Sequence, residues 1–552
     1  MLPPLRIASI GLVLCLAAPA AAVEPDAPER LISAEEAVLI SIRSRLSKLE
    51  PKRRDLTQFE KGDALDRERL ADFYATLADH VPGAVGPLWV TADGLTERAR
   101  EAAVEISKAD EWGLDPNDFV IPQSDFARDG KLTASQLLDL EMKTSLAILK
   151  YVRFARGGRM DPTDLSLDID RKPPLLPAAD VLRGAYEADD IARFLRDQHP
   201  QHEQFKKLRE AYLKLRDEER DQAEMGDSAE VRSSFRKRRR DAGTPLSQRL
   251  LYNMEMWRWM PRELGDFHVH ANIPEFRIRV IKDGSIIHSE RMITGKVKNK
   301  TPLFSDELEY LEFRPDWSVP ASIKVKEILP KIFRGRDIES QGRRVKWNGR
   351  DIDSSRIDWS REDIRNFHIY QPPGQRNALG LVKFMFPNKH AVYFHDTPTK
   401  HLFKKKVRAY SHGCMRVRNP MKMATVLLGH DKGWGRDRID QIVASGIDNN
   451  RIYLEQKYPV HVSYFTARAN QDGEIEVTDD IYGHEPLIQK GFDGLAHTIV
   501  KEDRSLDKYV AAKQTSRGRV AERTTPSPWF QYQPSRRSRD DRWRRNVFGF
   551  NN

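Results

Sequence analysis

Apolar residues in the first part of the chain recur with the period of an α-helix. One series has the spacing i, i+3, i+4, i+7 and consists of Leu70, Phe73, Tyr74 and Leu77. These side chains share one helix face, which is typical of a helix packed on a core. A second series opens with Thr133 and Gln136, which have the form of a capping box, and stops at the glycine pair 157–158. We predict a helical scaffold domain over residues 23–200, without a candidate catalytic group.

Residues 201–265 are richer in charge. Their apolar positions lie close to heptad spacing and are Phe205, Leu208, Tyr212 and Leu215. This series covers only about two helical turns, which is too short to predict a coiled coil. The basic run 236–240 could contact nucleic acid, but a solvated helix face is the favoured interpretation. We therefore predict a charged helical linker over residues 201–265.

The hydrophobic period changes from helical to alternating near residue 266. Phe276, Ile278 and Val280 alternate with charged residues, and Asp283-Gly284 is typical of a hairpin turn. Further short strands are expected at 391–394, 451–454 and 461–465, and helices only near 361–365 and after residue 420. The pattern predicts a mainly-β domain over residues 266–484. The fold class is therefore α+β and multidomain, with a helical scaffold preceding the β domain.

The composition indicates a folded chain with an excess of positive charge. Of 552 residues, 39% are apolar and 9% aromatic, which excludes wholesale disorder. Lys+Arg 92 against Asp+Glu 82 gives a net charge of +10, which favours anionic partners. Residues 485–552 are predicted to be a basic, disordered tail. Arginines and aromatic residues interleave at its end, and we hypothesise that they help to attach the chain to an anionic polymer.

Residues 1–22 have the features of a secretory signal peptide. Arg6 precedes a short apolar run, and Ala20-Ala21-Ala22 fits an A-x-A cleavage site. The run is too short to cross a bilayer, which needs about 20 residues. We expect a secreted protein of the periplasm or cell envelope, with no transmembrane anchor after cleavage and no nucleic-acid partner. Cys414 would then be the one cysteine of the mature chain, because Cys15 is removed.

Cys414 lies in the sequence Ser411-His412-Gly413-Cys414. A thiol becomes a strong nucleophile as the thiolate, and a nearby imidazole can accept its proton. His395 follows an apolar strand and precedes a loop, which favours it as the base over His412. A buried structural cysteine is the alternative on composition alone. A metal site built from the nearby histidines is disfavoured, because no C-x-x-C or H-E-x-x-H spacing is present.

The segment from His395 to Val417 resembles the signature of the L,D-transpeptidases, cysteine enzymes that cross-link peptidoglycan. His395 and Cys414 are separated by 19 positions (414 − 395), and Ser411 occupies the Ser/Thr position of the motif. The resemblance extends to the larger YcbB-type branch. The blocks that carry it are 256–261, Gly295 with Thr301-Pro302, 317–323, 373–380 and 480–483. The small peptidoglycan-binding module usual in that branch is not recognisable at residues 201–265.

The resemblance implies two acyl transfers. Cys414 would attack a tetrapeptide stem, release D-alanine and form a thioester, and an acceptor amine would resolve it as a 3→3 cross-link. His395 would act as the base, held by a backbone carbonyl such as that of Asp396. The remaining implied site residues are His412, Gly413 and Ser411 around the oxyanion, and Arg416, Asn377 and Asp396 as substrate-binding candidates. A structural ion pair is the alternative for Arg416, and a tight turn is the favoured interpretation of Asn377. No cofactor or metal is implied.

Further expectations follow from the same resemblance. The partners would be peptidoglycan stem peptides and, as a further candidate, wall-linked proteins. The biological role would be cell wall biogenesis and cell shape, with carbapenems as inhibitors. Residues 324–370 are expected to form a lid. Two alternatives stay open, namely an L,D-carboxypeptidase or hydrolase using the same cysteine, and a non-catalytic wall-binding scaffold, because acceptor choice depends on pocket shape.

Overall fold

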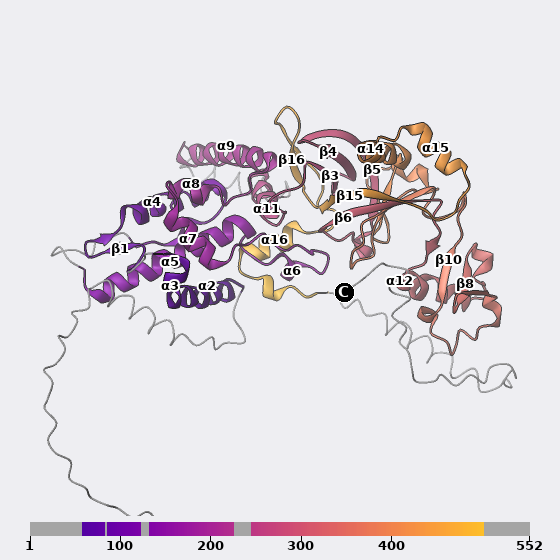
Figure 1. The fold of residues 1–552 in the computed structure, drawn as a ribbon, viewed down its shortest axis with the longest axis horizontal. Helices are drawn as coiled ribbons and strands as arrows, with labels where there is room; N and C mark the ends of the chain where they lie inside the picture. Colours follow the sequence, from indigo (N-terminus) through magenta and orange to yellow (C-terminus); the bar gives the residue numbers. More distant parts are fainter. Residues whose placement is uncertain (1–57, 83–85, 123–131, 226–243, 502–552) are drawn as a thin grey trace, which may run out of the picture.

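A computed structural model describes residues 58–82, 86–122, 132–225 and 244–501 (Figure 1). The predicted signal peptide, the basic run 236–240 and the arginine-rich end of the predicted tail lie outside these described residues. Among the described residues, every helix is too short or too polar to cross a bilayer.

The N-terminal module is helical, as predicted, and has its own apolar core. Its elements are α2 Gln58–Ala75, α3 Leu77–His80, β1 Val90–Thr91, β2 Gly94–Leu95, α4 Glu97–Ile106, α5 Ala134–Gly157, α6 Pro162–Leu165, α7 Ala178–Glu187 and α8 Ile191–Arg196. The predicted apolar face from Leu70 to Leu77 is buried. The predicted capping box is also confirmed, because the amide of Gln136 donates to the Thr133 hydroxyl and the amide of Thr133 donates to the Gln136 side chain.

The described parts of residues 201–265 are helical, as predicted, but two packed helices replace the predicted linker. These helices are α9 Glu203–Met225 and α11 Leu246–Arg258. Phe205 and Leu208 on α9 are fully buried in the same core as the β domain. Trp257 of α11 stacks on Phe465, with ring centres 4.4 Å apart. This segment is rich in charged residues, but α9 and α11 each have an apolar face that packs on the barrel.

The β domain is a closed sheet. Its strands are β3 Phe267–Asn272, β4 Arg277–Lys282, β5 Ser285–Gly295, β6 Phe304–Phe313, β11 Val382–Met385, β12 Phe394–His395, β13 Ala409–Ser411, β14 Met415–Val417 and β15 Asn450–Ser463. The spatial order is β13-β5-β14-β12-β11-β6-β15-β3-β4, and a β4–β5 pairing closes the barrel. The predicted hairpin at Asp283-Gly284 is confirmed. Segments 451–454 and 461–465, predicted as two strands, belong mostly to β15, whose register shifts between Tyr453 and Tyr458.

Helices cover the barrel and extend the domain beyond its predicted end. They are α14 Pro420–Lys432, α15 Arg436–Ala444 and α16 Glu485–Phe492. Ile488 of α16 and Ala496 after it are buried in the barrel core. Tyr252 of α11 donates a hydrogen bond to Gln489 across 2.7 Å. The predicted boundary at residue 484 is therefore too early, because residues 485–499 are part of the folded domain. Two further short strands, β16 Ala467–Ala469 and β17 Ile475–Val477, form a separate hairpin.

Residues 317–371 form a subdomain inserted between β6 and β11 (Figure 1). Its elements are β7 Trp317–Ser318, α12 Ala321–Ile323, a π-helical turn Lys324–Ile328, α13 Leu329–Ile332, β8 Arg344–Trp347, β9 Arg350–Ile352 and β10 His368–Gln371. The sheet order is β7-β10-β8-β9. A separate apolar cluster, which includes Ile328, Ile338 and Ile369, forms its core. The insertion predicted at 324–370 is thus a folded unit, and the predicted helix near 361–365 is a 3-10 turn, Ile364–Asn366.

Candidate active site

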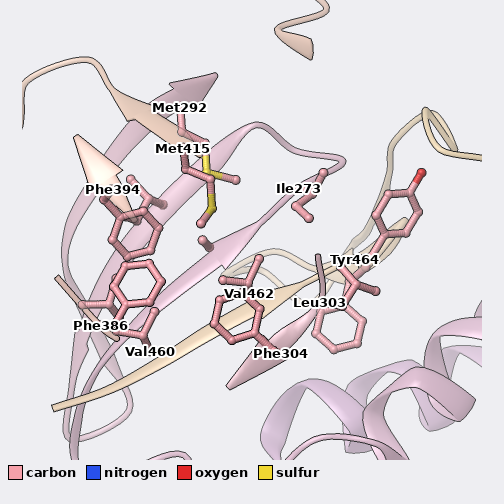
Figure 2. Close-up of a cluster of buried hydrophobic side chains, with 14 of the residues drawn as sticks. Ile273, Met292, Leu303, Phe304, Phe386, Phe394, Met415, Val460, Val462 and Tyr464 are labelled. Atoms are coloured by element: carbon pink, nitrogen blue, oxygen red, sulfur yellow. The ribbon is translucent and has the colours of Figure 1, made fainter. Parts of the chain in front are cut away.

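Two short parallel strands carry the histidine and the cysteine. β12 pairs with β14 so that Phe394 lies opposite Met415 and His395 opposite Arg416. Phe394 and Met415 are buried in the barrel core (Figure 2). Because side chains alternate between the two faces of a strand, their neighbours lie on the other face. The side chains of Tyr393, His395, Cys414 and Arg416 therefore lie on one side of the β12–β14 pair.

His395 is held by the backbone of the next residue. It is only 4% exposed. Its Nδ1 lies 2.5 Å from the carbonyl oxygen of Asp396, which confirms the expected orienting carbonyl. With Nδ1 as the donor, Nε2 is the nitrogen that can accept a proton. The Asp396 carboxylate in turn accepts from the amides of Leu381 (2.9 Å) and Thr397 (2.7 Å) and binds Lys400, so it is not free to bind a substrate.

Cys414 lies immediately before β14 and is half-buried. Its Sγ is 3.9 Å from the carbonyl oxygen of Ala391 and also hydrogen-bonds the Tyr393 hydroxyl. The Tyr393 and His395 rings have centres 5.7 Å apart. Ala391 has a φ of 53°, which is unusual for a residue with a side chain and is typical of a constrained functional loop. The thiol therefore lies among polar groups supplied by the β12 segment.

Electrostatics favours uncharged side chains in the resting site. Burial raises the pKa of Cys414 to about 11, although Tyr393 and the Arg416 guanidinium oppose this shift. Burial and Arg416 lower the pKa of His395 to about 3. At neutral pH the thiol keeps its proton and the imidazole is neutral. A base is therefore needed to deprotonate Cys414 when a substrate reacts.

The Ser411–Cys414 turn is fixed by hydrogen bonds. The Ser411 hydroxyl donates to the Cys414 carbonyl oxygen across 2.5 Å and accepts from the Gly413 amide across 3.2 Å. Gly413 has a φ of 122°, a conformation that L side chains rarely adopt. The Gly413 amide, which we expected to face an oxyanion, donates to the Ser411 hydroxyl in this structure. The donors beside Sγ are the backbone amides of Tyr393 and Cys414 and the Tyr393 hydroxyl.

Behind this turn lies a buried network of residues that the sequence analysis named only as blocks of the resemblance, without a structural role. The Thr301 hydroxyl donates to the Gly413 carbonyl oxygen (2.7 Å) and accepts from the Gly295 amide (2.9 Å). The Tyr482 hydroxyl donates to the Gly295 carbonyl oxygen (2.7 Å) and accepts from the Thr301 amide (3.2 Å). Two segments far apart in the sequence, residues 295–301 and the one that contains Tyr482, thus support the cysteine loop.

The His412 side chain contacts the insertion. Its Nε2 is 2.5 Å from a carboxylate oxygen of Glu327, which belongs to the π-helical turn. The expectation that His412 helps to hold an oxyanion is therefore not met in this structure. Instead, the residue connects the cysteine loop with the 317–371 subdomain.

The remaining predicted residues divide into two kinds. Arg416 has no ion-pair partner within the described chain, and its one side-chain hydrogen bond goes to the Thr399 hydroxyl, 3.1 Å away. It is therefore free to bind a carboxylate. Asn377 is different, because it is 2% exposed and donates to the carbonyl oxygens of Pro315, Gln371 and Pro372. Asn377 stabilises a turn, which agrees with the favoured interpretation of this residue.

Two histidines that are near each other in sequence pair with different carboxylates. His390 pairs with Asp170 at 2.8 Å, and His412 pairs with Glu327. Within the described residues, no three His, Cys, Asp or Glu side chains are placed to hold a metal ion. Tyr393 was missed as a site residue because the sequence pattern shows it only as part of an apolar strand. Its position two residues before His395 was the available signal.

Two protein families match this chain. Residues 68–211 match the family described as "Scaffold domain", and residues 266–428 match the "L,D-transpeptidase catalytic domain". A Haemophilus influenzae protein named "Putative L,D-transpeptidase" is 32% identical over 250 residues, which are 44% of this chain and 49% of that protein. This chain therefore spans about half the length of that relative.

One solved structure with a similar segment is an L,D-transpeptidase from Mycobacterium smegmatis, at 13% sequence identity. The match covers 36% of this chain and 58% of that chain, and the TM-score is 0.18. An L,D-transpeptidase in complex with imipenem has 13% identity, 36% and 58% coverage and a TM-score of 0.17. These TM-scores are too low to support a conclusion about this chain.

Proposed function

Because this chain carries an L,D-transpeptidase catalytic domain behind a scaffold domain, we propose that it is a YcbB-type L,D-transpeptidase that forms 3→3 peptidoglycan cross-links through Cys414. The observation that carries this proposal is the common face of β12 and β14. On that face lie a thiol, a buried imidazole with its Nδ1 fixed by a carbonyl, and an arginine without an ion-pair partner in the described chain.

The first half-reaction acylates the cysteine. As Sγ of Cys414 attacks the carbonyl between the third and fourth residues of a tetrapeptide stem, His395 Nε2 takes the thiol proton. The new C–S bond forms, the amide C–N bond breaks, and the same proton passes to the leaving amine of D-alanine. The Cys414 amide and the Tyr393 hydroxyl are placed to donate to the developing oxyanion. Arg416 would bind a stem carboxylate.

The second half-reaction transfers the acyl group. The side-chain amine of an acceptor's third residue attacks the thioester, so that a C–N bond forms and the C–S bond breaks. His395 takes a proton from the amine and returns it to the thiolate. The enzyme then has its starting protonation state. This chemistry places the protein in the periplasm or cell envelope, where it would contribute to wall biogenesis and cell shape.

Purified tetrapeptide stems test the proposal. We expect mass spectrometry to show a dimer lighter than two stems by one alanine, and no product with the Cys414→Ala variant. A tripeptide as the exclusive product would identify a carboxypeptidase instead. Unchanged cross-linking by a folded Cys414→Ala protein would show that another group is the nucleophile.

A further inference from the structure

Two lysine-rich segments flank the strand pairing that leads to the cysteine loop. β13 pairs with β5 in parallel, with Ala409 opposite Thr294 and Ser411 opposite Gly295, so residues 404–408 lead into this pairing and residues 296–300 follow it. The Thr294 amide donates to the Arg408 carbonyl oxygen (2.9 Å), and the Lys296 amide donates to the Ser411 carbonyl oxygen (3.0 Å). We call the cationic residues of these segments the basic surface, which consists of Lys296, Lys298, Lys300, Lys404, Lys405, Lys406 and Arg408.

The lysines of the basic surface are not neutralised. Within the described chain none of the six has an ion-pair partner, and all except the half-buried Lys300 are exposed. Lys300 lies with its ammonium 5.9 Å from the centre of the Tyr482 ring. The segments 296–302 and 400–411 contain no acidic residue. Six unpaired cations at the two ends of this strand pairing attract polyanions over about a Debye length, ~10 Å at 0.1 M salt.

Arg408 fixes the shape of this surface. Its guanidinium donates to the carbonyl oxygens of Met292, Lys405 and Lys406, and so ties the lysine loop to β5. Burial and the nearby guanidinium groups of three other arginines lower the pKa of Arg408 to about 10, which indicates a local excess of positive charge. The adjacent acids are occupied by other arginines, because Glu290 binds Arg418 at 2.8 Å.

We propose that the basic surface docks the wall polymer through the carboxylates of stem peptides that flank the one in the active site. This inference rests on the proposed function for the identity of the polymer. The Lys296–Ser411 hydrogen bond makes the surface continuous with the cysteine loop, so a polymer that presents one stem to Cys414 lies within reach of these lysines. Stem peptides end in carboxylates, which match an ammonium surface in charge. The surface thereby supplies attachment that a separate wall-binding module would otherwise provide.

Binding to purified sacculi tests the proposal without catalysis. The full chain carrying Cys414→Ala is compared with the same chain carrying K404E, K405E and K406E. The matched control carries K108E, K172E and K214E, which make the same charge change at exposed positions of the helical module and of α9. At about 0.1 M salt we expect about tenfold weaker pelleting of the surface variant and little change in the control. At about 1 M salt, where the Debye length is ~3 Å, the difference should disappear.

Chemical treatment of the sacculi identifies the ligand. Amidation of carboxylates with a neutral amine should abolish the difference between the surface variant and its parent, whereas acid removal of phosphate-linked polymers should leave it intact. The reverse pattern would overturn the assignment to stem carboxylates. Equal pelleting of the surface variant and the control would overturn docking at this surface. If docking follows the expectation but wild-type protein does not cross-link soluble stems, the proposed function fails and the docking surface stands.

Discussion

The hydroxyl of Thr301 donates a hydrogen bond to the carbonyl oxygen of Gly413 across 2.7 Å. The same hydroxyl accepts from the Gly295 amide, so one side chain joins β5 to the turn that carries Cys414. The geometry of the nucleophile therefore depends on a residue that does not touch the substrate.

Replacing Thr301 by valine should disturb this turn while keeping its volume. The change leaves a buried carbonyl and a buried amide without partners, which costs about 1–3 kcal/mol for each such group. We expect about a tenfold or greater loss of kcat with KM changed less than threefold, and rescue by Thr301→Ser. Steady-state kinetics on soluble stems measures both constants. A Thr301→Val enzyme with wild-type kcat would show that the turn does not need this support.

The reactivity of Cys414 should rise steeply with pH. Because burial raises its pKa to about 11, the reactive thiolate is a small fraction at pH 7 and increases about tenfold per pH unit below that pKa. We expect alkylation by iodoacetamide to accelerate continuously from pH 7 to beyond pH 9. The Cys414→Ala chain measures reaction at other groups. A plateau beginning near pH 6 would instead indicate a thiolate–imidazolium pair at rest.

Features that depend only on residues near one another in sequence could be predicted correctly. The Thr133 capping box and the Asp283-Gly284 hairpin are set by short-range chemistry, and both occur as predicted. The carbonyl of Asp396 beside His395 is also a local relationship.

Partners distant in sequence could not be predicted in the same way. Gly413 meets Thr301 across 112 positions, and His412 meets Glu327 across 85, so these contacts exist only once the barrel and its insertion have folded. The linker interpretation failed for a related reason. The two helices of residues 201–265 look charged in sequence, but the few apolar residues at their contact face, such as Phe205, decide how they pack.

A carbapenem should acylate Cys414. Its strained carbonyl reacts with a thiol to give a stable thioester, and the donors beside Sγ would stabilise the oxyanion. Intact-mass measurement should show one adduct per chain, absent from Cys414→Ala. In the His395→Asn variant we expect acylation at least tenfold slower, because the base is lost. A rate within about threefold of wild type would identify another base.

The His412–Glu327 contact should restrain the inserted subdomain. The two side chains are 31% and 43% exposed, and pairs of this kind contribute about 0–1 kcal/mol. Glu327→Gln should therefore raise the rate at which a bulky maleimide labels Cys414 by about two- to fivefold. Glu362→Gln, an exposed change in the same subdomain, is the matched control. Equal labelling of the two variants would argue against a restraint at this contact.

Acid should destabilise the junction between the helical module and the barrel. His202, His268, His270 and His461 lie there, with the rings of His268 and His461 centred 5.4 Å apart. Burial lowers the pKa of His461 to about 3 and that of His202 to about 4, and it also lowers the pKa of His268 and His270. Neighbouring Arg171, Arg262 and Arg279 disfavour protonation further, as the same pKa shifts reflect.

The free energy of unfolding should fall in acid because the unfolded chain binds more protons than the folded chain. Between about pH 6.5 and pH 4 the unfolded chain takes up protons at these histidines and the folded chain does not, so stability falls as pH falls. Each such histidine contributes up to about 1.4 kcal/mol per pH unit in that range. Urea unfolding at pH 7.5, 6 and 5 should show this loss, and His461→Gln should reduce the slope by about one proton. His430→Gln, at an exposed residue whose ring stacks on Phe267 of the barrel, is the control. A free energy of unfolding that stays constant from pH 7.5 to 5 would mean that these histidines accept protons without cost in the folded chain.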